Sequence, residues 1–283
     1  MCRWLAYSGS PLRLEELILK PKRSLVDQSL HAQLGATTTN GDGFGVGWYE
    51  ADGASPRVYR STHPAWNDRN LRELAGSIAS PCFLAHIRAS TGTAIQETNT
   101  HPFRHGEWLW MHNGLVREFP RLSRALRFAV DDALYPELEG TTDSETMFYL
   151  ALTFGLQDDP PAAVERMVGF VEETGRRYGV EQPIQMTVAT TNGRRLWAFR
   201  YSSEGRSRSL FFSRRVDDVR ALHPEVEALA QLSPETRVIV SEPLGDLSGA
   251  WNEMPEASWG AVGGGDDELH SFRPAAGVAV AVP

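Results

Sequence analysis

The chain opens with the stretch MCRWLAYSGS (residues 1–10), and one of its two cysteines stands at position 2. A second residue as small as Cys2 normally allows an aminopeptidase to remove Met1, so that the mature chain would begin with a free thiol and a free α-amine. The apolar residues 4–7 that follow are typical of a strand leading directly away from Cys2. The stretch therefore has two interpretations, a reactive N-terminal centre or a cysteine that merely enters a strand.

The composition is that of an ordinary soluble globular protein. The 283 residues are 41% hydrophobic and 23% charged, which is enough apolar material to bury a full core. The net charge of -8 argues against a nucleic-acid partner, because phosphate binding needs clustered lysine and arginine. Two cysteines form no disulfide framework and indicate a reducing compartment. With neither a signal-peptide block nor an apolar stretch long enough to span a membrane, we expect a cytoplasmic protein without a membrane partner.

The order of the expected elements predicts an α+β fold. Residues 11–19 have helical spacing of leucines between Pro11 and Pro21, which predicts a short helix. Apolar residues recur at helical spacing in three longer segments: 120–134, 142–156 and 161–179. Short apolar runs predict strands at 46–50, 56–61, 82–90, 107–114, 184–191, 195–201, 209–213 and 236–244. Helices and strands come in blocks, which argues against a doubly wound parallel sheet.

One domain with a modest tail is the organisation that this pattern favours. The composition shows no break that would mark a linker before the glycine-rich segment near Gly263. We therefore expect a domain over residues 2–262 and a C-terminal tail over residues 263–283. The tail is either an edge strand or a partly disordered end.

Polar clusters at strand ends and helix starts are the candidates for chemistry: NGDGFG (40–45), HIRAST (86–91), MHNG (111–114) and TTDSE (141–145). The glycines of the first cluster are typical of a turn, and the cluster lacks the Lys-Ser/Thr pair of a phosphate loop. In the second cluster, Arg88 interrupts an apolar strand at its end. It is either a surface charge or the planar fork of donors that a carboxylate ligand needs.

The last two clusters also have purely structural interpretations. Asn113-Gly114 is a strong turn signal, yet a side-chain amide beside a glycine N–H also supplies two donors for an oxyanion. In the fourth cluster, Thr142 or Asp143 can cap a helix that carries Glu145 in its first turn, so capping accounts for most of it.

The histidines raise the question of a metal site, because His86, His101, His105 and His112 lie within 27 positions. The His101/His105 pair has i,i+4 spacing, but Pro102 argues against the helix that would put both rings on one face. The sequence contains no H-E-x-x-H and no paired cysteine set, so it does not indicate zinc. A Ser-His-Asp hydrolase is not indicated either, because no G-x-S-x-G elbow is present.

The clusters taken together resemble the class II glutamine amidotransferase domain of the N-terminal-nucleophile hydrolases. The segments that carry the resemblance occur in the order MCRWLAYSG, NGDGFGVGW, HIRASTGT, NTHPF, MHNGLV and TDSE. The later VIVSEPL resembles a segment of the stand-alone members, so the resemblance spans roughly residues 2–244. It implies a four-layer αββα sandwich and makes residues 2–262 an amidotransferase domain.

The resemblance also implies a role for each site residue. Cys2 would be the nucleophile, with its own α-amine as the general base. The Asn113 side chain and the Gly114 N–H would hold the oxyanion.

Four further positions would bind the glutamyl group of the substrate. Arg88 would clamp its α-carboxylate and Asp143 would receive its α-ammonium. Thr91 would add a contact through its backbone or hydroxyl, and His112 would line the pocket without transferring a proton.

The implied activity is cleavage of the γ-amide of glutamine or of a γ-glutamyl small molecule through a thioester on Cys2, with no cofactor and no metal. Only about 40 residues follow VIVSEPL, too few for a domain that uses ammonia. Either a separate synthase subunit receives the ammonia, or the enzyme hydrolyses a γ-glutamyl amide outright.

Two alternatives remain open at this point. The stand-alone members include the γ-glutamyl hydrolase of ergothioneine biosynthesis, which is similar in length and in its MCR start, although Trp4 stands where we expect a histidine in that enzyme. The other alternative is an inactive glutamine-sensing or scaffold subunit. The presence of Cys2, Arg88, Asn113 and Asp143 argues against lost activity.

Overall fold

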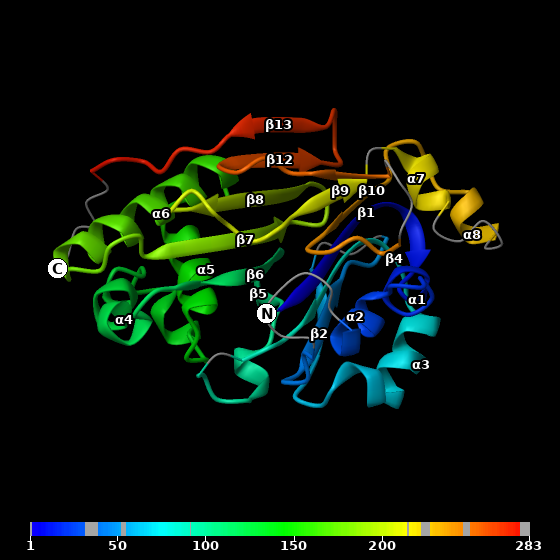
Figure 1. The fold of residues 1–283 in the computed structure, drawn as a ribbon, viewed down its shortest axis with the longest axis horizontal. Coiled ribbons are helices and arrows are strands. Elements are labelled where there is room, and N and C mark those ends of the chain that lie inside the picture. The colour runs from blue at the N-terminus through cyan, green and yellow to red at the C-terminus, as the bar shows by residue number, and fades with distance from the viewer. Residues whose placement is uncertain are drawn as a thin grey trace.

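Two antiparallel β-sheets lie face to face in the computed structural model, and helices cover the outer face of each sheet (Figure 1). The structure describes residues 2–31, 39–51, 55–90, 92–213, 215–221, 227–245 and 250–277. The layers follow the order helices, sheet, sheet, helices. This arrangement confirms the predicted α+β sandwich with four αββα layers.

The first sheet is built around β1, which pairs antiparallel with β10 on one side and β4 on the other. Its strands, in spatial order, are β11 (Trp251–Glu253), β9 (Phe211–Ser213), β10 (Arg237–Val240), β1 (Arg3–Arg13), β4 (Ala79–Ile87), β2 (Phe44–Trp48) and β3 (Arg57–Ser61). Successive side chains of a strand point to opposite faces. Leu5 and Tyr7 therefore pack in the core under the helices, whereas Trp4 and Ala6 pack in the core between the sheets.

The second sheet has β6 and β7 near its middle, paired antiparallel over their full lengths. Its strands, in spatial order, are β13 (Glu268–Ser271), β12 (Ser258–Val262), β8 (Leu196–Ser202), β7 (Ile184–Thr191), β6 (Trp108–Val116) and β5 (Phe103–His105). The edge strand β13 comes from the C-terminal part of the chain. The domain boundary expected at residue 262 stays a prediction.

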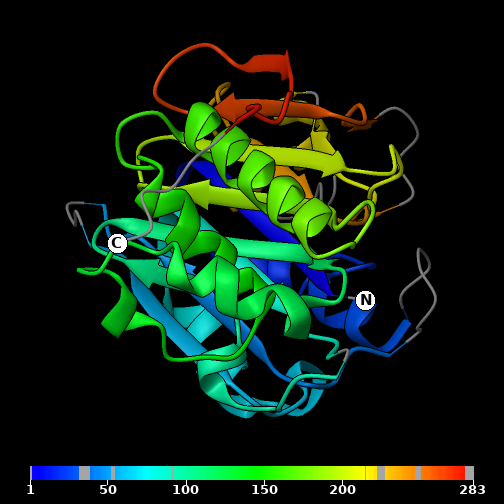
Figure 2. The ribbon, with the colours of Figure 1, turned by 90° about the vertical axis from the view of Figure 1, so that its left-hand side faces the viewer.

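The helices form two separate outer layers. One layer covers the first sheet and contains α1 (Glu15–Ile18), α2 (Leu25–His31), α3 (Arg69–Ser77), α7 (Val216–Arg220) and α8 (Glu227–Ala230). The other covers the second sheet and contains α4 (Phe119–Phe128), α5 (Asp143–Thr153) and α6 (Pro160–Arg177), the green helices of Figure 2. Single turns of 3-10 helix occur at Ala65–Asn67, Glu97–Asn99 and Tyr135–Glu137.

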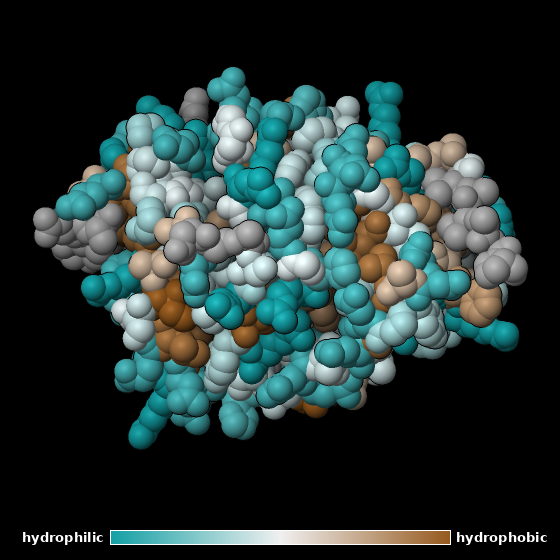
Figure 3. Space-filling model, turned by 180° about the vertical axis from the view of Figure 1, so that it is seen from behind, coloured by the Kyte–Doolittle hydropathy of each residue, from teal (hydrophilic) through white to brown (hydrophobic). Residues whose placement is uncertain are grey.

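The three long helices confirm the predictions made from apolar spacing, and their buried faces form the largest core together with β6, β7 and β8. No helix in the described part of the chain is both long and apolar enough to cross a membrane. The face shown in Figure 3 carries its apolar side chains in small separate areas among polar ones, as is usual for the surface of a globular domain.

The helix expected over residues 11–19 is mostly wrong. Strand β1 continues through Pro11 to Arg13, and only Glu15–Ile18 forms a helical turn. The pairing of β1 with β4 shifts register between Ser8 and Leu12 and then resumes. Pairing with a neighbouring strand therefore overrides the local helical spacing, and an irregularity in the ladder accommodates the proline that has no N–H to donate.

A buried ionic network fixes the start of β1. Arg3 Nε donates to Glu242 Oε2 at 3.0 Å, and Arg23 Nη2 donates to Glu242 Oε1 at 2.8 Å. The same Arg3 guanidinium donates through Nη1 to the carbonyl oxygen of Cys2 at 3.0 Å. Because Glu242 is only 1% exposed, removing its charge would leave a buried arginine without its counter-ion.

We therefore expect Glu242→Gln to lower the free energy of unfolding by about 3–5 kcal/mol, measured by urea denaturation. The control is Glu173→Gln on α6, whose carboxylate pairs with the exposed Arg176 and Arg177. That substitution should cost no more than about 1 kcal/mol. A Glu242→Gln variant as stable as the control would contradict a structural role for the network.

Candidate active site

Cys2 lies at the start of β1, where side-chain alternation points it in the same direction as Trp4, toward the second sheet. Its Sγ is 3.5 Å from the backbone nitrogen of Ala89 and 3.6 Å from the carbonyl oxygen of that residue. Burial raises the pKa of the Cys2 thiol, the positive charge of Arg88 opposes this shift, and the negative charge of Asp143 adds to it. The group therefore stays a thiol at neutral pH and needs a base to become a nucleophile.

Asn113 and Gly114 lie inside strand β6 and form no turn, contrary to one of the two interpretations of that dipeptide. They pair with Thr187 and Met186 of β7. Thr187 Oγ1 accepts from the Trp4 indole at 3.2 Å and donates to the Asn113 carbonyl at 3.3 Å. These bonds tie the strand that carries Cys2 to the strand that carries Asn113.

The donors of Asn113 and Gly114 are free to bind a ligand. Asn113 is 4% exposed, and its side-chain amide has no hydrogen-bond partner among the described residues. Backbone N–H groups alternate between the two edges of a strand. The Val116 N–H donates to Asp143 Oδ2 at 2.7 Å, so the Gly114 N–H points to that same edge, away from β7.

Only glycine fits at position 114. A Cβ atom there would lie 1.9 Å from the Gln185 carbonyl oxygen and 2.6 Å from His112 Nε2. The close approach of β7 and of the His112 ring therefore excludes any side chain.

Arg88 follows β4 and is 3% exposed. Its Nη2 donates to Thr93 Oγ1 at 2.7 Å and to the Ala94 carbonyl at 3.1 Å, which fixes the plane of the guanidinium. Burial lowers the pKa of Arg88, and the negative charge of Asp42, with that of a Cys2 thiolate when one forms, opposes this shift. Within the described ranges no carboxylate forms an ion pair with it, so this buried cation can accept an anionic ligand.

Asp143 is the first residue of α5, which Thr142 caps by accepting from the Glu145 N–H at 3.2 Å. One carboxylate oxygen of Asp143 accepts from the Val116 N–H, and the other accepts from the Ser144 N–H at 2.7 Å. None of the cations in the described segments forms an ion pair with it. The helix cap predicted from TTDSE is therefore present, and it holds a carboxylate that lacks a cationic partner.

Three buried histidines lie behind these groups. His112 Nδ1 is 2.8 Å from Ser144 Oγ, which donates to Asp143 Oδ1 at 3.3 Å. The rings of His86 and His101 pack against each other with centroids 4.2 Å apart and planes tilted by 37°. Burial lowers the pKa of all three rings, that of His86 to about 3, and the negative charge of Asp143 partly opposes the shift at His112. They are therefore neutral at neutral pH.

The site is open to solvent at its Asp143 end. A cleft of about 930 Å³ begins at Gly114 and Asp143 and runs along α4 toward Tyr135. Such a volume is larger than a glutamyl group needs. Thr91, which was expected to contact the substrate, lies outside the described residues.

The structure brings Arg88 and Asp143 within electrostatic range of Cys2, and it places Asn113 and Gly114 on a strand of the facing sheet. His112 reaches Asp143 through Ser144 and is 1% exposed. The bonds made by Ser144 and Thr187 had no signal in the sequence, because they depend on the packing of α5 and on the register of β7.

One arginine near the thiol was also missed. The segment of Arg208 is bonded through Ser209 and Ser241 to Trp4, two residues after Cys2. Arg208 stands in the polar segment SEGRSRS (203–209), which resembles an ordinary loop.

Comparison with known proteins gives consistent matches. The sequence matches the family model described as "Glutamine amidotransferases class-II" over residues 22–275. It is 32% identical to the probable glutamine amidotransferase DUG3 of Saccharomyces cerevisiae, over 91% of this chain and 80% of that protein. It is 29% identical to the gamma-glutamyl-hercynylcysteine sulfoxide hydrolase of Mycolicibacterium smegmatis, over 90% of this chain and 93% of that protein.

Among solved structures, a glutamine aminotransferase class-II domain protein from Silicibacter pomeroyi superimposes with a TM-score of 0.73 at 31% identity. The superposition covers 97% of this chain and 100% of that one. The glutamine phosphoribosylpyrophosphate amidotransferase of B. subtilis shares the fold at 12% identity, with a TM-score of 0.62 over half of its length.

The neutral histidines make the protein sensitive to acid. The unfolded chain binds a proton on His86 at about pH 6.5, whereas the folded protein binds it only near pH 3. Protons therefore favour the unfolded state, and the stability that the neutral ring confers is lost as the pH falls from about 6.5 to about 3.

We expect His86→Leu to reduce the slope of unfolding free energy against pH by about 1.4 kcal/mol per pH unit between pH 6 and pH 4. Urea denaturation at a series of pH values measures both slopes, and the wild type is the reference. Parallel slopes for the two proteins would show that His86 is not held neutral.

Proposed function

Because this chain belongs to the class II glutamine amidotransferases, we propose that it cleaves the γ-amide bond of glutamine or of a γ-glutamyl small molecule, with Cys2 as the nucleophile. The observation that carries the proposal is the pair of unpartnered charges beside the thiol. Buried Arg88 has no carboxylate partner and Asp143 has no cationic partner among the described residues. Together they complement the carboxylate and ammonium of a glutamyl head group.

Activation of the thiol uses the α-amine of Cys2 after removal of Met1. An α-amine has a pKa of about 7.7–8.0 and a free thiol about 8.5, and burial raises the pKa of the thiol further. The neutral amine therefore takes the proton from Sγ only as the sulfur attacks. A base on the same residue as the nucleophile needs no separate positioning.

Attack by Sγ forms a carbon–sulfur bond to the γ-carbonyl and moves its electron pair onto oxygen. The Asn113 amide and the Gly114 N–H provide the two donors for this oxyanion, and loss of one such donor typically costs about 2.7–4 kcal/mol of transition-state stabilisation. When the intermediate collapses, the carbon–nitrogen bond breaks and the leaving amine takes the proton from the α-ammonium. A γ-glutamyl thioester remains, and water hydrolyses it to glutamate and free thiol.

Positioning of the head group falls to Arg88 and Asp143. The bonds from Arg88 to Thr93 and Ala94 hold its fork in place before substrate arrives. The bonds to Asp143 from the Val116 and Ser144 backbone do the same for the carboxylate. Holding both ends of the amino acid fixes the γ-carbonyl against the thiol. In this scheme His112 acts through Ser144 on Asp143 and transfers no proton. Thr91 is proposed to add a contact to the same head group.

A second candidate is hydrolysis of a γ-glutamyl sulfoxide of the kind named for the mycobacterial relative. It is favoured by an alignment that covers nine-tenths of both chains. Delivery of ammonia to a separate synthase subunit is a further route for the same chemistry. We also propose that the protein acts in the cytoplasm, where reducing conditions keep the Cys2 thiol free.

The test of the nucleophile is an intact mass before and after treatment with 6-diazo-5-oxo-L-norleucine, a glutamine analogue that alkylates thiols. We expect a chain that lacks Met1 and gains a single adduct. Cys2→Ala should gain none and release no glutamate. The matched control is Cys82→Ala, which should still gain one adduct, because Cys82 is 2% exposed and burial raises the pKa of its thiol to about 11. Glutamate release by Cys2→Ala would exclude this nucleophile.

For the head-group clamp, we expect Arg88→Lys to lower kcat/KM for glutamine by about 10- to 100-fold, mainly through KM, because the planar fork of two donors is lost. Alkylation by iodoacetamide, which has no α-carboxylate, should change far less. Arg69→Lys on α3 is the control, since that arginine is exposed on the opposite side of the first sheet. An unchanged kcat/KM, or an equal loss with iodoacetamide, would show that Arg88 is not the clamp.

A further inference from the structure

Arg208 lies between β8 and β9, and its side chain has no partner. The guanidinium forms neither a hydrogen bond nor an ion pair with any residue that the structure describes, although its Nε is buried. A buried donor without an acceptor costs free energy, and a charged donor costs more. The residue as a whole is partly exposed, and in a chain with a net charge of -8 its guanidinium stands without a carboxylate partner among the described residues.

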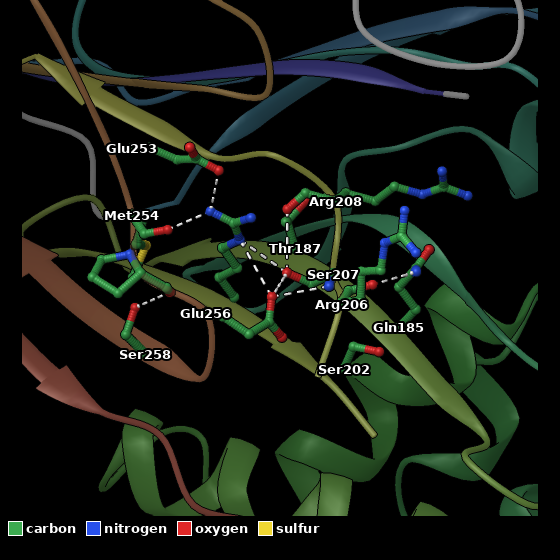
Figure 4. A network of polar contacts seen from close by, with 12 residues as sticks. Gln185, Thr187, Ser202, Arg206, Ser207, Arg208, Glu253, Met254, Glu256 and Ser258 are labelled. Atoms are coloured by element: carbon green, nitrogen blue, oxygen red, sulfur yellow. Dashed lines mark hydrogen bonds and ion pairs between the residues drawn. The ribbon is translucent and has the colours of Figure 1, made fainter. Parts of the chain in front are cut away.

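The backbone of this segment is firmly held. The N–H and hydroxyl of Ser207 both donate to Glu256 Oε2, and Arg200 Nε donates to Ser207 Oγ at 2.9 Å. The side chain of Gln185 on β7 donates to the Arg206 carbonyl at 2.8 Å. Figure 4 shows this network, with the Arg208 side chain extending away from it on the side opposite Glu253. Arg208 is therefore placed by a fixed segment.

The nearby carboxylates are engaged elsewhere. Glu253 and Glu256 both pair with Arg200. Glu204, whose charge also acts on the pKa of Arg208, pairs with Arg117 at 2.6 Å. Each of these carboxylates thus forms an ion pair with a cation other than Arg208.

The segment that carries Arg208 adjoins the start of β1, the strand that Cys2 precedes. Ser209 Oγ donates to the Ser241 carbonyl at 2.9 Å, and Ser241 Oγ accepts from the Trp4 N–H at 3.0 Å. Burial lowers the pKa of Arg208, and the first of the charges that act on it is that of Cys2, which raises it. The charges that act on the pKa of Arg88 are those of Cys2 and Asp42. Arg88 follows the end of β4 and Arg208 precedes β9, so the two arginines come to the surroundings of Cys2 from different elements.

We propose that Arg208 binds a carboxylate on the amine half of the substrate, so that the preferred substrates are γ-glutamyl amino acids or peptides. The proposal rests on the cleavage of a γ-glutamyl amide at Cys2 proposed above. Arg88 and Asp143 already satisfy the head group, and the amine half leaves from the other side of the γ-carbonyl. Ammonia from glutamine carries no anionic group, so glutamine would leave Arg208 without a partner.

The test compares amides that differ only in that carboxylate. γ-Glutamylglycine is paired with γ-glutamylglycinamide, and γ-glutamyl-β-alanine with γ-glutamyl-β-alaninamide, so that two distances between the amide nitrogen and the carboxylate are sampled. The readout is the ratio of kcat/KM between acid and amide within each pair, in which any general loss of activity cancels. We expect the wild type to favour the acid by about 10- to 100-fold in at least one pair.

In Arg208→Gln this ratio should fall to near one, and Arg208→Lys should keep part of it. Arg69→Gln, a matched loss of an exposed arginine on α3, should retain the full ratio. Two results would overturn the role of Arg208 and leave the proposed function standing. One is release of glutamate from all amides without preference for the acid, and the other is an unchanged ratio in Arg208→Gln. Equal slowing of acid and amide would instead indicate an effect on the thiolate and would also overturn it. No glutamate from any of the amides or from glutamine would overturn the proposed function itself.

Discussion

The buried bond between Arg3 and Glu242 is the interaction on which the rest of the site depends. The carboxylate joins the first strand to the segment after β10, and the same guanidinium holds the carbonyl of Cys2. Without this bond, the end of the strand next to the nucleophile would fray. Taking these charges out of water is costly, and the pairing of Glu242 with Arg23 helps to offset the cost. The ionic network thus gives a terminal residue the fixed position that catalysis requires.

The distribution of partners separates structural charges from the proposed functional ones. Glu242 has two arginines, whereas Arg88, Asp143 and Arg208 have no oppositely charged partner in the described part of the chain. Neutral groups hold Arg88 and backbone N–H groups hold Asp143, whereas Arg208 extends from a segment whose backbone is fixed. The charge of each residue therefore stays available for a ligand. This is the arrangement expected of a preorganised site, where the enzyme bears the cost of burying charge during folding and the ligand supplies the missing counter-ion.

The sequence predicted the layers well where local and tertiary preferences agree. Helices α4 and α6 each have one apolar face, and α5 is buried on nearly all sides, so their apolar residues alone identified them. Prediction failed where pairing between strands overrode a local signal, as at Pro11 within β1 and at the turn signal of Asn113-Gly114 within β6. The residues of the candidate site were found because they belong to recognisable motifs. Arg208 was not found, because the sequence does not distinguish an arginine without an ion-pair partner from an ordinary surface arginine. The distinction requires the structure, which shows that the nearby carboxylates already pair with other cations.

The surroundings of the thiol also restrict which group can act as the base. Burial raises the pKa of Cys2, so the free thiolate is scarce at neutral pH. His86, His101 and His112 are neutral and buried, and His112 engages Ser144 through Nδ1. Among the described residues, the hydrogen-bond contacts of Cys2 Sγ are with the Ala89 backbone and not with any of these rings. Arg88 and Arg208 hold their protons. On the proposed mechanism, the remaining acceptor is the α-amine that Cys2 gains when Met1 is removed. Maturation of the N-terminus would then create the base and expose the nucleophile in a single step, so the unprocessed chain would be folded but inactive.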